Sequence, residues 1–140
     1  MSQTKVLVVE DRENWRLSFC DLLADMGYAV LEAKCGKDFC ALAEDADVIV
    51  LDISMPMEPG SIESKTTGLE VLIELQKKYT RAIALQNPIV RSMWLREDFT
   101  GTRFEEARIP EGYWVSRNLP TAELLDLIRS VESKSSEGVS

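Results

Sequence analysis

The hydrophobic residues of this chain fall into short apolar runs that alternate with segments of helical periodicity. Residues 5–9 and 47–51 are mostly apolar and β-branched, and each run is followed by an acidic residue, as is typical of strands buried on both faces of a sheet. Apolar residues at helical spacing predict helices over residues 13–26 and 37–43. Gly27 stands where the first of these helices should end.

The remaining elements continue the same alternation. Further strands are expected at residues 28–33, 88–93 and 112–116, and a final helix at 120–131. A long polar loop spans residues 53–66, and Thr67-Gly68-Leu69-Glu70 matches a capping box that would begin the third helix. Residues 95–111 show no clean apolar stripe, and Pro110 prevents a helix from continuing to the last strand.

Strand–helix alternation repeated five times predicts an α/β fold, because parallel strands need helical crossovers that cover both faces of the sheet. We expect one domain over residues 1–132, since 140 residues are the usual length of a single domain. Residues 133–140 are polar and Ser-rich, and we expect a disordered tail or the start of a linker there.

The amino-acid composition excludes several classes of function. A net charge of -8 argues against direct nucleic acid binding, which rests on clustered Lys and Arg, and no apolar run is long enough for a membrane span. The chain has no histidine, which rules out Ser-His-Asp and Cys-His catalysis within it. Cys20, Cys35 and Cys40 form no C-x-x-C motif, and we interpret them as small buried residues in a reducing cytoplasm.

Acidic residues follow two of the predicted strands. Glu10 and Asp11 come after the first strand and Asp52 after the third, and in a parallel sheet these ends form the functional edge. Three carboxylates at one edge repel one another unless a cation neutralises them, and oxygen ligands without His or Cys suit Mg²⁺. The alternative is that these acids only end their strands at a solvated edge.

These residues carry a family resemblance. The segment from Val6 to Asp11, the segment from Val48 through Asp52 to Met55-Pro56, and Gly68-Leu69-Glu70-Val71-Leu72 resemble the receiver domain of bacterial two-component response regulators. The resemblance covers residues 4–132 and is weak between 76 and 111. It implies a doubly wound five-stranded parallel sheet of the flavodoxin-like type, with strand order 2-1-3-4-5 and helices on both faces.

The resemblance also implies site roles. Asp52 would accept a phosphoryl group from a sensor histidine kinase or phosphotransfer protein. Asp11, Asp52 and the backbone carbonyl of Ser54 would bind Mg²⁺, with Glu10 acting through water. The chain would then be a cytoplasmic signalling domain rather than an enzyme. It would act on an output domain or partner protein, and it could form a homodimer. It would bind neither nucleic acid nor membrane directly.

The residues that contact the phosphoryl group in this family match this sequence less well than the acidic residues do. Ser92 is the preferred switch hydroxyl after the fourth strand, and the competing register puts Gln86 or Asn87 there. Arg117 stands where the family has Lys, and the two side chains are not interchangeable because the guanidinium is planar and its fork is wider. Trp114 falls where the family often has a switching aromatic; packing at the rim of the sheet is the alternative.

Three functions remain open from the sequence. The leading one is a phosphorylatable receiver. The second is a pseudo-receiver that binds proteins without phosphotransfer, which the residues Arg117 and Asn118 and the irregular segment 96–111 favour. The third is an unrelated enzyme on a similar sheet. A haloacid-dehalogenase phosphatase would need Asp-x-Asp, but Ser54 occupies the second position, and the acids after the first strand do not suit a flavin or dinucleotide phosphate.

Overall fold

The structure is a computed structural model that describes the backbone of residues 3–139 and the side chains of residues 3–134. Its main sheet has five strands in the order β2-β1-β3-β6-β7, and every neighbouring pair is parallel. The strands are β1 (Lys5–Val9), β2 (Ala29–Ala33), β3 (Val48–Leu51), β6 (Ile89–Ser92) and β7 (Trp114–Ser116). Since β6 and β7 are the fourth and fifth strands of this sheet, the predicted order 2-1-3-4-5 is confirmed.

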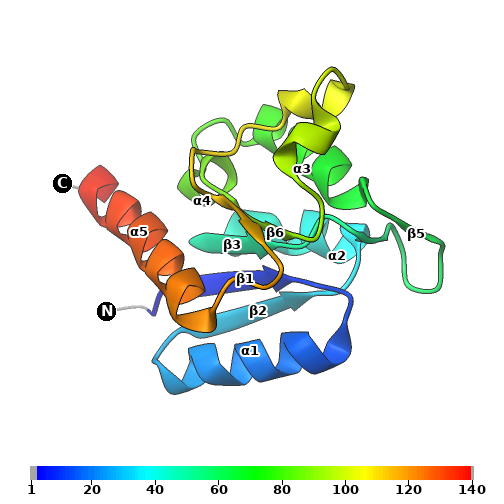
Figure 1. Cartoon of the computed structure of the whole chain (residues 1–140). Helices are drawn as coiled ribbons and strands as arrows, with labels where there is room; N and C mark the ends of the chain where they lie inside the picture. Colours follow the sequence, from blue (N-terminus) through cyan, green and yellow to red (C-terminus); the bar gives the residue numbers. More distant parts are fainter. Residues whose placement is uncertain (1–2, 140) are drawn as a thin grey trace.

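Helices cover both faces of this sheet, as a doubly wound fold requires. They are α1 (Glu13–Asp25), α2 (Gly36–Leu42), α3 (Thr67–Lys78), the short α4 (Ile83–Gln86) and α5 (Thr121–Val139). A single turn of 3-10 helix, η1 (Ala43–Asp45), continues α2. In Figure 1, α1 lies on one side of the sheet and α2 and α3 lie on the other.

The two central strands form the core of the molecule. All four residues of β3 are buried, as are the last four of β1, so the apolar runs predicted to be buried on both faces are confirmed. Leu7 and Ile49 pair across these strands and are completely excluded from solvent. Because β1 and β3 are packed in this core, the residues that follow Val9 and Leu51 have fixed positions.

The polar loop after β3 contains an element that the sequence did not predict. Strands β4 (Met55–Pro56) and β5 (Glu63–Ser64) pair antiparallel and form a small hairpin. The hairpin projects at the right of Figure 1, beside the edge where the strands of the main sheet end. Each strand has only two residues and little apolar content, which is too short for the alternation on which strand prediction depends.

The predicted capping box at Thr67 is wrong. Thr67 is the first residue of α3, and the residue before it, Thr66, makes no side-chain hydrogen bond that caps the helix. Instead the Gly68 N–H donates to the Ile53 carbonyl at 2.9 Å. A Cβ at Gly68 would lie 2.6 Å from the Ile53 Cα, so only glycine lets the helix start this close to the loop.

Residues 83–92 decide between the two registers considered for the fourth strand. The segment proposed as the competing strand contains α4, whereas β6 begins at Ile89 and ends at Ser92. The preferred register is therefore confirmed. Gln86 and Asn87 lie before β6 and cannot occupy its carboxyl end.

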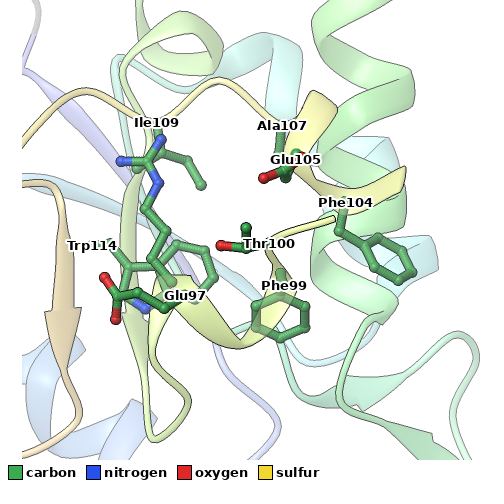
Figure 2. A pocket seen from close by; sticks show the side chains of 9 residues that line it. Glu97, Phe99, Thr100, Phe104, Glu105, Ala107, Ile109 and Trp114 are labelled. Carbon is green, nitrogen blue, oxygen red and sulfur yellow. The ribbon is translucent and has the colours of Figure 1, made fainter. Parts of the chain in front are cut away.

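Two short 3-10 helices occupy the irregular segment 95–111, where no α-helix forms. They are η2 (Arg96–Phe99) and η3 (Arg103–Glu106). Buried Gln76 of α3 holds this segment, because its Nε2 donates to the carbonyls of Leu85 and Arg108 and its Oε1 accepts from the Arg108 N–H. A cavity of about 400 Å³ remains between the segment and Trp114 of β7 (Figure 2).

The last helix is longer than the sequence predicted. Leu124, Ile128 and Val131 are buried against the sheet, as the apolar spacing indicated, but the backbone of α5 continues to Val139 instead of ending at Val131. The expected tail therefore continues the helix as far as residue 139, and Ser140 lies outside the described residues. Within the described chain, no helix is both long and apolar enough to cross a membrane.

Candidate functional site

The carboxyl ends of the strands bring the predicted site residues together. Val9 pairs with Leu51 in the parallel register of β1 and β3, so Glu10 and Asp52 leave the sheet at the same edge. The Asp52 N–H donates to the Val9 carbonyl at 2.9 Å, which continues this pairing into the site. Residues at the ends of β6 and β7 complete the edge.

Asp52 lies at the centre of the site and is only 2% exposed. Its Oδ2 accepts a 2.7 Å hydrogen bond from Nη2 of Arg117, and its Oδ1 accepts one of 3.0 Å from the Ser54 N–H. The predicted phosphoacceptor is therefore directly paired with the residue that stands in the family's lysine position. Both carboxylate oxygens are held in fixed directions.

The environment of Asp52 opposes its negative charge on balance. Burial raises the pKa of the Asp52 carboxyl above its ordinary value, and the nearby Glu10 charge raises it further. The hydrogen bonds from Arg117 and Ser54 act in the opposite direction and lower this pKa, without reversing the net shift. Arg117 and the Ser54 N–H are therefore the groups that favour the ionised, nucleophilic form.

Glu10 is completely buried and is paired with two arginines. Its Oε1 lies 3.2 Å from Nη2 of Arg12 and 3.2 Å from Nη1 of Arg91, and its Oε2 accepts from the Arg12 N–H. The Arg16 guanidinium donates to the Glu10 backbone carbonyl. Glu10 was expected to hold Mg²⁺ through water, but arginine side chains contact its carboxylate instead.

Arg91 joins two parts of the site. Its guanidinium stacks on the Trp15 ring at 3.7 Å, and its Nη2 donates to the Arg117 carbonyl at 3.0 Å. Together Arg12, Arg91 and Arg117 are paired with Glu10 and Asp52. Two of the three acids whose mutual repulsion suggested a metal cation are thus already compensated by arginines.

Asp11 is the acid at this edge that still has an uncompensated oxygen. Its Oδ1 is buried and has no hydrogen-bond partner. Burial raises the pKa of the Asp11 carboxyl, and the charges of Glu63 and Asp52 raise it further against a lowering contribution from Glu10. A buried carboxylate oxygen without a partner, close to a second carboxylate, suits a cation.

The donor set therefore fits Mg²⁺ in part. Asp11 and Asp52 are hard oxygen ligands at one edge, and the backbone carbonyl of Ser54 belongs to the same loop. Among the described residues, no three Asp, Glu, Cys or His side chains are close enough to share one ion. An ion here would thus rely on two carboxylates, a carbonyl and water, as Mg²⁺ commonly does.

Ser92 lies at the carboxyl end of β6 and is 3% exposed. Its Oγ accepts a hydrogen bond from the Trp94 N–H at 2.9 Å, and its carbonyl accepts from the Arg117 N–H at 3.0 Å. Ser92 therefore contacts the Arg117 backbone through its carbonyl, and the switch role of its hydroxyl stays a prediction. No contact with Asp52 is formed by this hydroxyl in the described structure.

Trp114 lies at the rim of the sheet and is partly buried. Its Nε1 donates to the Trp94 carbonyl at 2.9 Å, and its ring lies 5.6 Å from that of Phe99. Figure 2 shows the two aromatic side chains beside the cavity of segment 95–111. Trp94 thus connects Ser92 and Trp114 through its backbone, and the switching role of Trp114 stays a prediction.

A second cavity is lined by Ser54 and Arg117, which contact Asp52. It has a volume of about 410 Å³ and is lined by residues from the ends of β1, β3, β6 and β7 and from the hairpin. The lining residues are Asp11, Arg12, Ser54, Glu63, Lys65, Met93, Trp94 and Arg117. Ser54 and Arg117 each contact the Asp52 carboxylate, so a phosphoryl group on Asp52 would have room to point into this cavity.

Sequence reasoning missed several residues of this site. Arg91 carried a usable signal, because a single charged residue within an otherwise apolar strand must find a buried partner. Arg12 stood beside the acids in the sequence, but its pairing with Glu10 depends on side-chain direction. Lys65 and Trp94 reach the site through the tertiary fold and gave no local signal.

The fold is similar to several solved response regulators. A CheY-like response regulator receiver domain protein from Methanospirillum hungatei JF-1 aligns with a TM-score of 0.74 and 18% identity, over 97% of this chain and 99% of that chain. TrrA of Thermotoga maritima, solved in complex with Mg²⁺-BeF, aligns with a TM-score of 0.67 and 24% identity, over 91% and 98%. The chemotaxis response regulator CheY4 of Vibrio cholerae gives 0.68 and 22%, over 93% and 99%.

Sequence comparison alone finds no relationship: no family model and no curated protein sequence matches this chain. At identities below 25%, what the solved structures establish is the fold. The strand order, the helices on both faces and the almost complete mutual coverage all agree with this likeness. The chain has the fold of the CheY-like receiver domains of response regulators.

Proposed function

We propose that this chain is a receiver domain that accepts a phosphoryl group on Asp52 and thereby switches a protein-interaction surface. The observation that carries the proposal is the buried Asp52 carboxylate at the end of β3, held by Arg117 at 2.7 Å beside a 410 Å³ cavity. Two further family positions, Asp11 and Ser92, lie at the ends of neighbouring strands. This arrangement supports phosphotransfer better than any other chemistry considered.

The reaction needs a nucleophile, charge compensation and space. The Asp52 carboxylate attacks the phosphorus of a phosphohistidine on a partner protein; the P–N bond breaks, and the imidazole leaves with its electron pair and takes up a proton. Arg117 compensates the charge of the transferred group, and the Ser54 N–H holds the other carboxylate oxygen. Since these 140 residues contain no histidine, the phosphodonor must lie outside them.

Mg²⁺ belongs to this proposal through Asp11, Asp52 and the Ser54 carbonyl. When bound, the ion would screen the charge between the attacking carboxylate and the phosphoryl oxygens. Asp11 contributes the carboxylate oxygen that lacks a partner, and Asp52 contributes the reacting carboxylate. TrrA of Thermotoga maritima was solved with Mg²⁺-BeF, which supports the use of this ion by the fold.

The proposed partners follow from the chemistry. A sensor histidine kinase or phosphotransfer protein would supply the phosphoryl group, and an output domain or partner protein would read the switched surface. Other chains with this fold include a LuxR-family DNA-binding response regulator and the first domain of a response regulator/sensory box/GGDEF protein. A cytoplasmic location and a role as phosphoacceptor rather than enzyme are part of the same proposal.

Acetyl phosphate with Mg²⁺ tests the proposal. Intact-mass measurement should show an adduct of one phosphoryl group on the wild type and none on Asp52→Asn. Asp21→Asn, which changes an exposed acid on α1, is the matched control and should keep the adduct. A wild type without adduct, or an adduct of equal yield on Asp52→Asn, would contradict the proposal.

A pseudo-receiver is the second candidate, and the three arginines favour it. They compensate Glu10 and Asp52 in the resting structure, so these two acids have cationic partners without a phosphoryl group or an ion. Such a module should bind its protein partner equally well in the wild type and in Asp52→Ala. Loss of partner binding in that variant would count against this alternative.

A further inference from the structure

We propose that Lys65 of the β4–β5 hairpin is a second cationic ligand for the phosphoryl group on Asp52. This inference rests on the proposed function and adds a residue from outside the strand ends. Lys65 lies directly after β5 and lines the same 410 Å³ cavity as Asp11, Ser54 and Arg117. The hairpin therefore contributes to the site rather than only lengthening a surface loop.

Backbone contacts fix both ends of the hairpin and thereby the position of Lys65. In the antiparallel pair, Met55 lies opposite Ser64 and Pro56 opposite Glu63. At the first end the Met57 carbonyl accepts a 2.8 Å hydrogen bond from the Lys37 N–H of α2, and at the second the helix α3 begins against the loop of Asp52. Lys65 is thus placed by backbone structure beside the mouth of the cavity.

The resting contact of Lys65 is weak. Its Nζ lies 4.6 Å from the centroid of the Trp94 ring, and an exposed cation–π contact of this kind contributes little. Within the described part of the chain, no carboxylate lies within ion-pair distance of this ammonium group. The side chain is exposed and free to turn from the indole toward an anion in the cavity.

A phosphoryl group changes the charge that Lys65 faces. The aspartyl phosphate adds about -1.5 to -2 charge and three acceptor oxygens to a cavity in which Arg117 is one donor. A charge-assisted hydrogen bond from an ammonium group to such an oxygen is stronger than a contact with an aromatic face. We therefore expect Lys65 to leave Trp94 and bind the phosphoryl group.

The same charge has the opposite effect on a cation. Before phosphorylation, the positive Lys65 lies near the carboxylates Asp11 and Glu63 and disfavours Mg²⁺ in the cavity. Removing the charge should weaken binding of a phosphoryl mimic and leave Mg²⁺ binding unchanged or tighter. A residue with a merely structural role would weaken both when it is replaced.

Beryllofluoride titration of the intact chain, followed by fluorine NMR, separates these effects. In Lys65→Met we expect the affinity for beryllofluoride to fall about fivefold, as for one partly exposed charge pair. Calorimetry without beryllofluoride should show Mg²⁺ affinity at or above the wild-type value. Lys65→Arg should restore beryllofluoride binding, and Lys78→Met, which removes a lysine stacked on Tyr79, should change neither affinity.

The outcomes distinguish this inference from the function on which it rests. If the wild type binds beryllofluoride and Lys65→Met binds it equally well, the role of Lys65 is wrong while the phosphoacceptor role stands. If Lys65→Met weakens beryllofluoride and Mg²⁺ binding together, Lys65 supports the hairpin structurally and the inference also fails. If the wild type binds no beryllofluoride at all, both proposals are overturned.

Discussion

The Arg91 guanidinium lies 3.2 Å from the Glu10 carboxylate, and both side chains are almost completely excluded from solvent. Such a pair is costly to separate, because removing one partner leaves a buried charge without compensation. The pair is also connected to the proposed phosphoacceptor site, because Arg91 donates to the carbonyl of Arg117. The pair links a position inside β6 to the residue that contacts Asp52.

Arg91→Met should therefore destabilise the fold. We expect the free energy of unfolding to fall by about 3 kcal/mol, the usual cost of leaving one member of a buried ion pair alone. Urea unfolding followed by circular dichroism measures this. Arg12→Met is the matched control, because Arg12 contacts the same carboxylate from an exposed position and should cost less than about 1 kcal/mol. Equal losses in the two variants would contradict the argument.

Arg117→Met should make stability depend on pH through Asp52. Without the guanidinium, the pKa of the folded carboxyl rises further above its unfolded value, because the bond that lowers it is gone. The folded state then gains a proton that the unfolded state lacks as pH falls, so the variant loses stability relative to wild type as pH rises above about 4.

Unfolding at pH 4 and pH 7 measures this dependence. We expect the deficit of Arg117→Met to grow by about 2 kcal/mol between the two values, as for a buried charged group left without its partner. The double variant with Asp52→Asn carries no charge at residue 52 and should lose the extra dependence. If the double variant keeps it, another group is responsible.

Arg12→Gln should tighten Mg²⁺ binding. The Arg12 side chain is half exposed, lines the cavity that contains Asp11, and brings a positive charge close to the proposed ion. Removing that charge should raise the Mg²⁺ affinity by up to about fivefold, which is the range of an exposed charge interaction. Calorimetric titration gives the affinity, and Arg129→Gln on α5 is the control. Unchanged or weaker binding would show that Arg12 does not act on the ion.

Gln76→Ala should loosen the segment that stands in place of a regular fourth helix. The variant leaves the carbonyls of Leu85 and Arg108 and one N–H without partners, so we expect a loss of about 2–3 kcal/mol. Hydrogen exchange should speed up first in residues 95–111. Gln86→Ala removes more exposed hydrogen bonds to the same region and should have a smaller effect. Uniform exchange across the chain would argue against a local role for Gln76.

The three cysteines should differ in reactivity. Burial raises the pKa of the Cys20 thiol to about 12, and Cys35 is completely excluded from solvent, whereas Cys40 is exposed. In the folded protein a disulfide reagent should therefore label Cys40 alone, and unfolding should release the other two thiols. Rapid labelling of a second thiol in the native state would contradict this assignment.

The sheet and the central acid could be predicted from the sequence because their signals are local. Buried parallel strands are continuous apolar runs, and the residue after each run must lie at the functional edge, which is how Asp52 and Asp11 were found. The partners of these acids could not be found in the same way. Arg117 reaches Asp52 across β6, and that contact depends on strand order and side-chain direction.

The errors have physical causes of the same kind. Thr67-Gly68-Leu69-Glu70 has the composition of a capping box, but the helix starts one residue earlier than a cap at Thr67 would require, with Thr67 as its first residue and the Gly68 N–H bonded to Ile53. The sequence of segment 95–111 has no helical period, and its backbone is held instead by Gln76, a side chain from another element. Local patterns carry no record of such long-range hydrogen bonds.

Because Gly68 contacts the loop of Asp52, helix α3 connects that loop to a second region of the molecule at its other end. At its first turn, the helix contacts the backbone of Asp52 and Ile53. Near its last turn, Gln76 accepts from and donates to the backbone of residue 108 and donates to the carbonyl of residue 85. Because Gly68 has no side chain, a displacement of the backbone at residues 52 and 53 would act directly on the helix backbone. Movement at the acceptor would be passed along the helix axis to the two 3-10 turns at its far end.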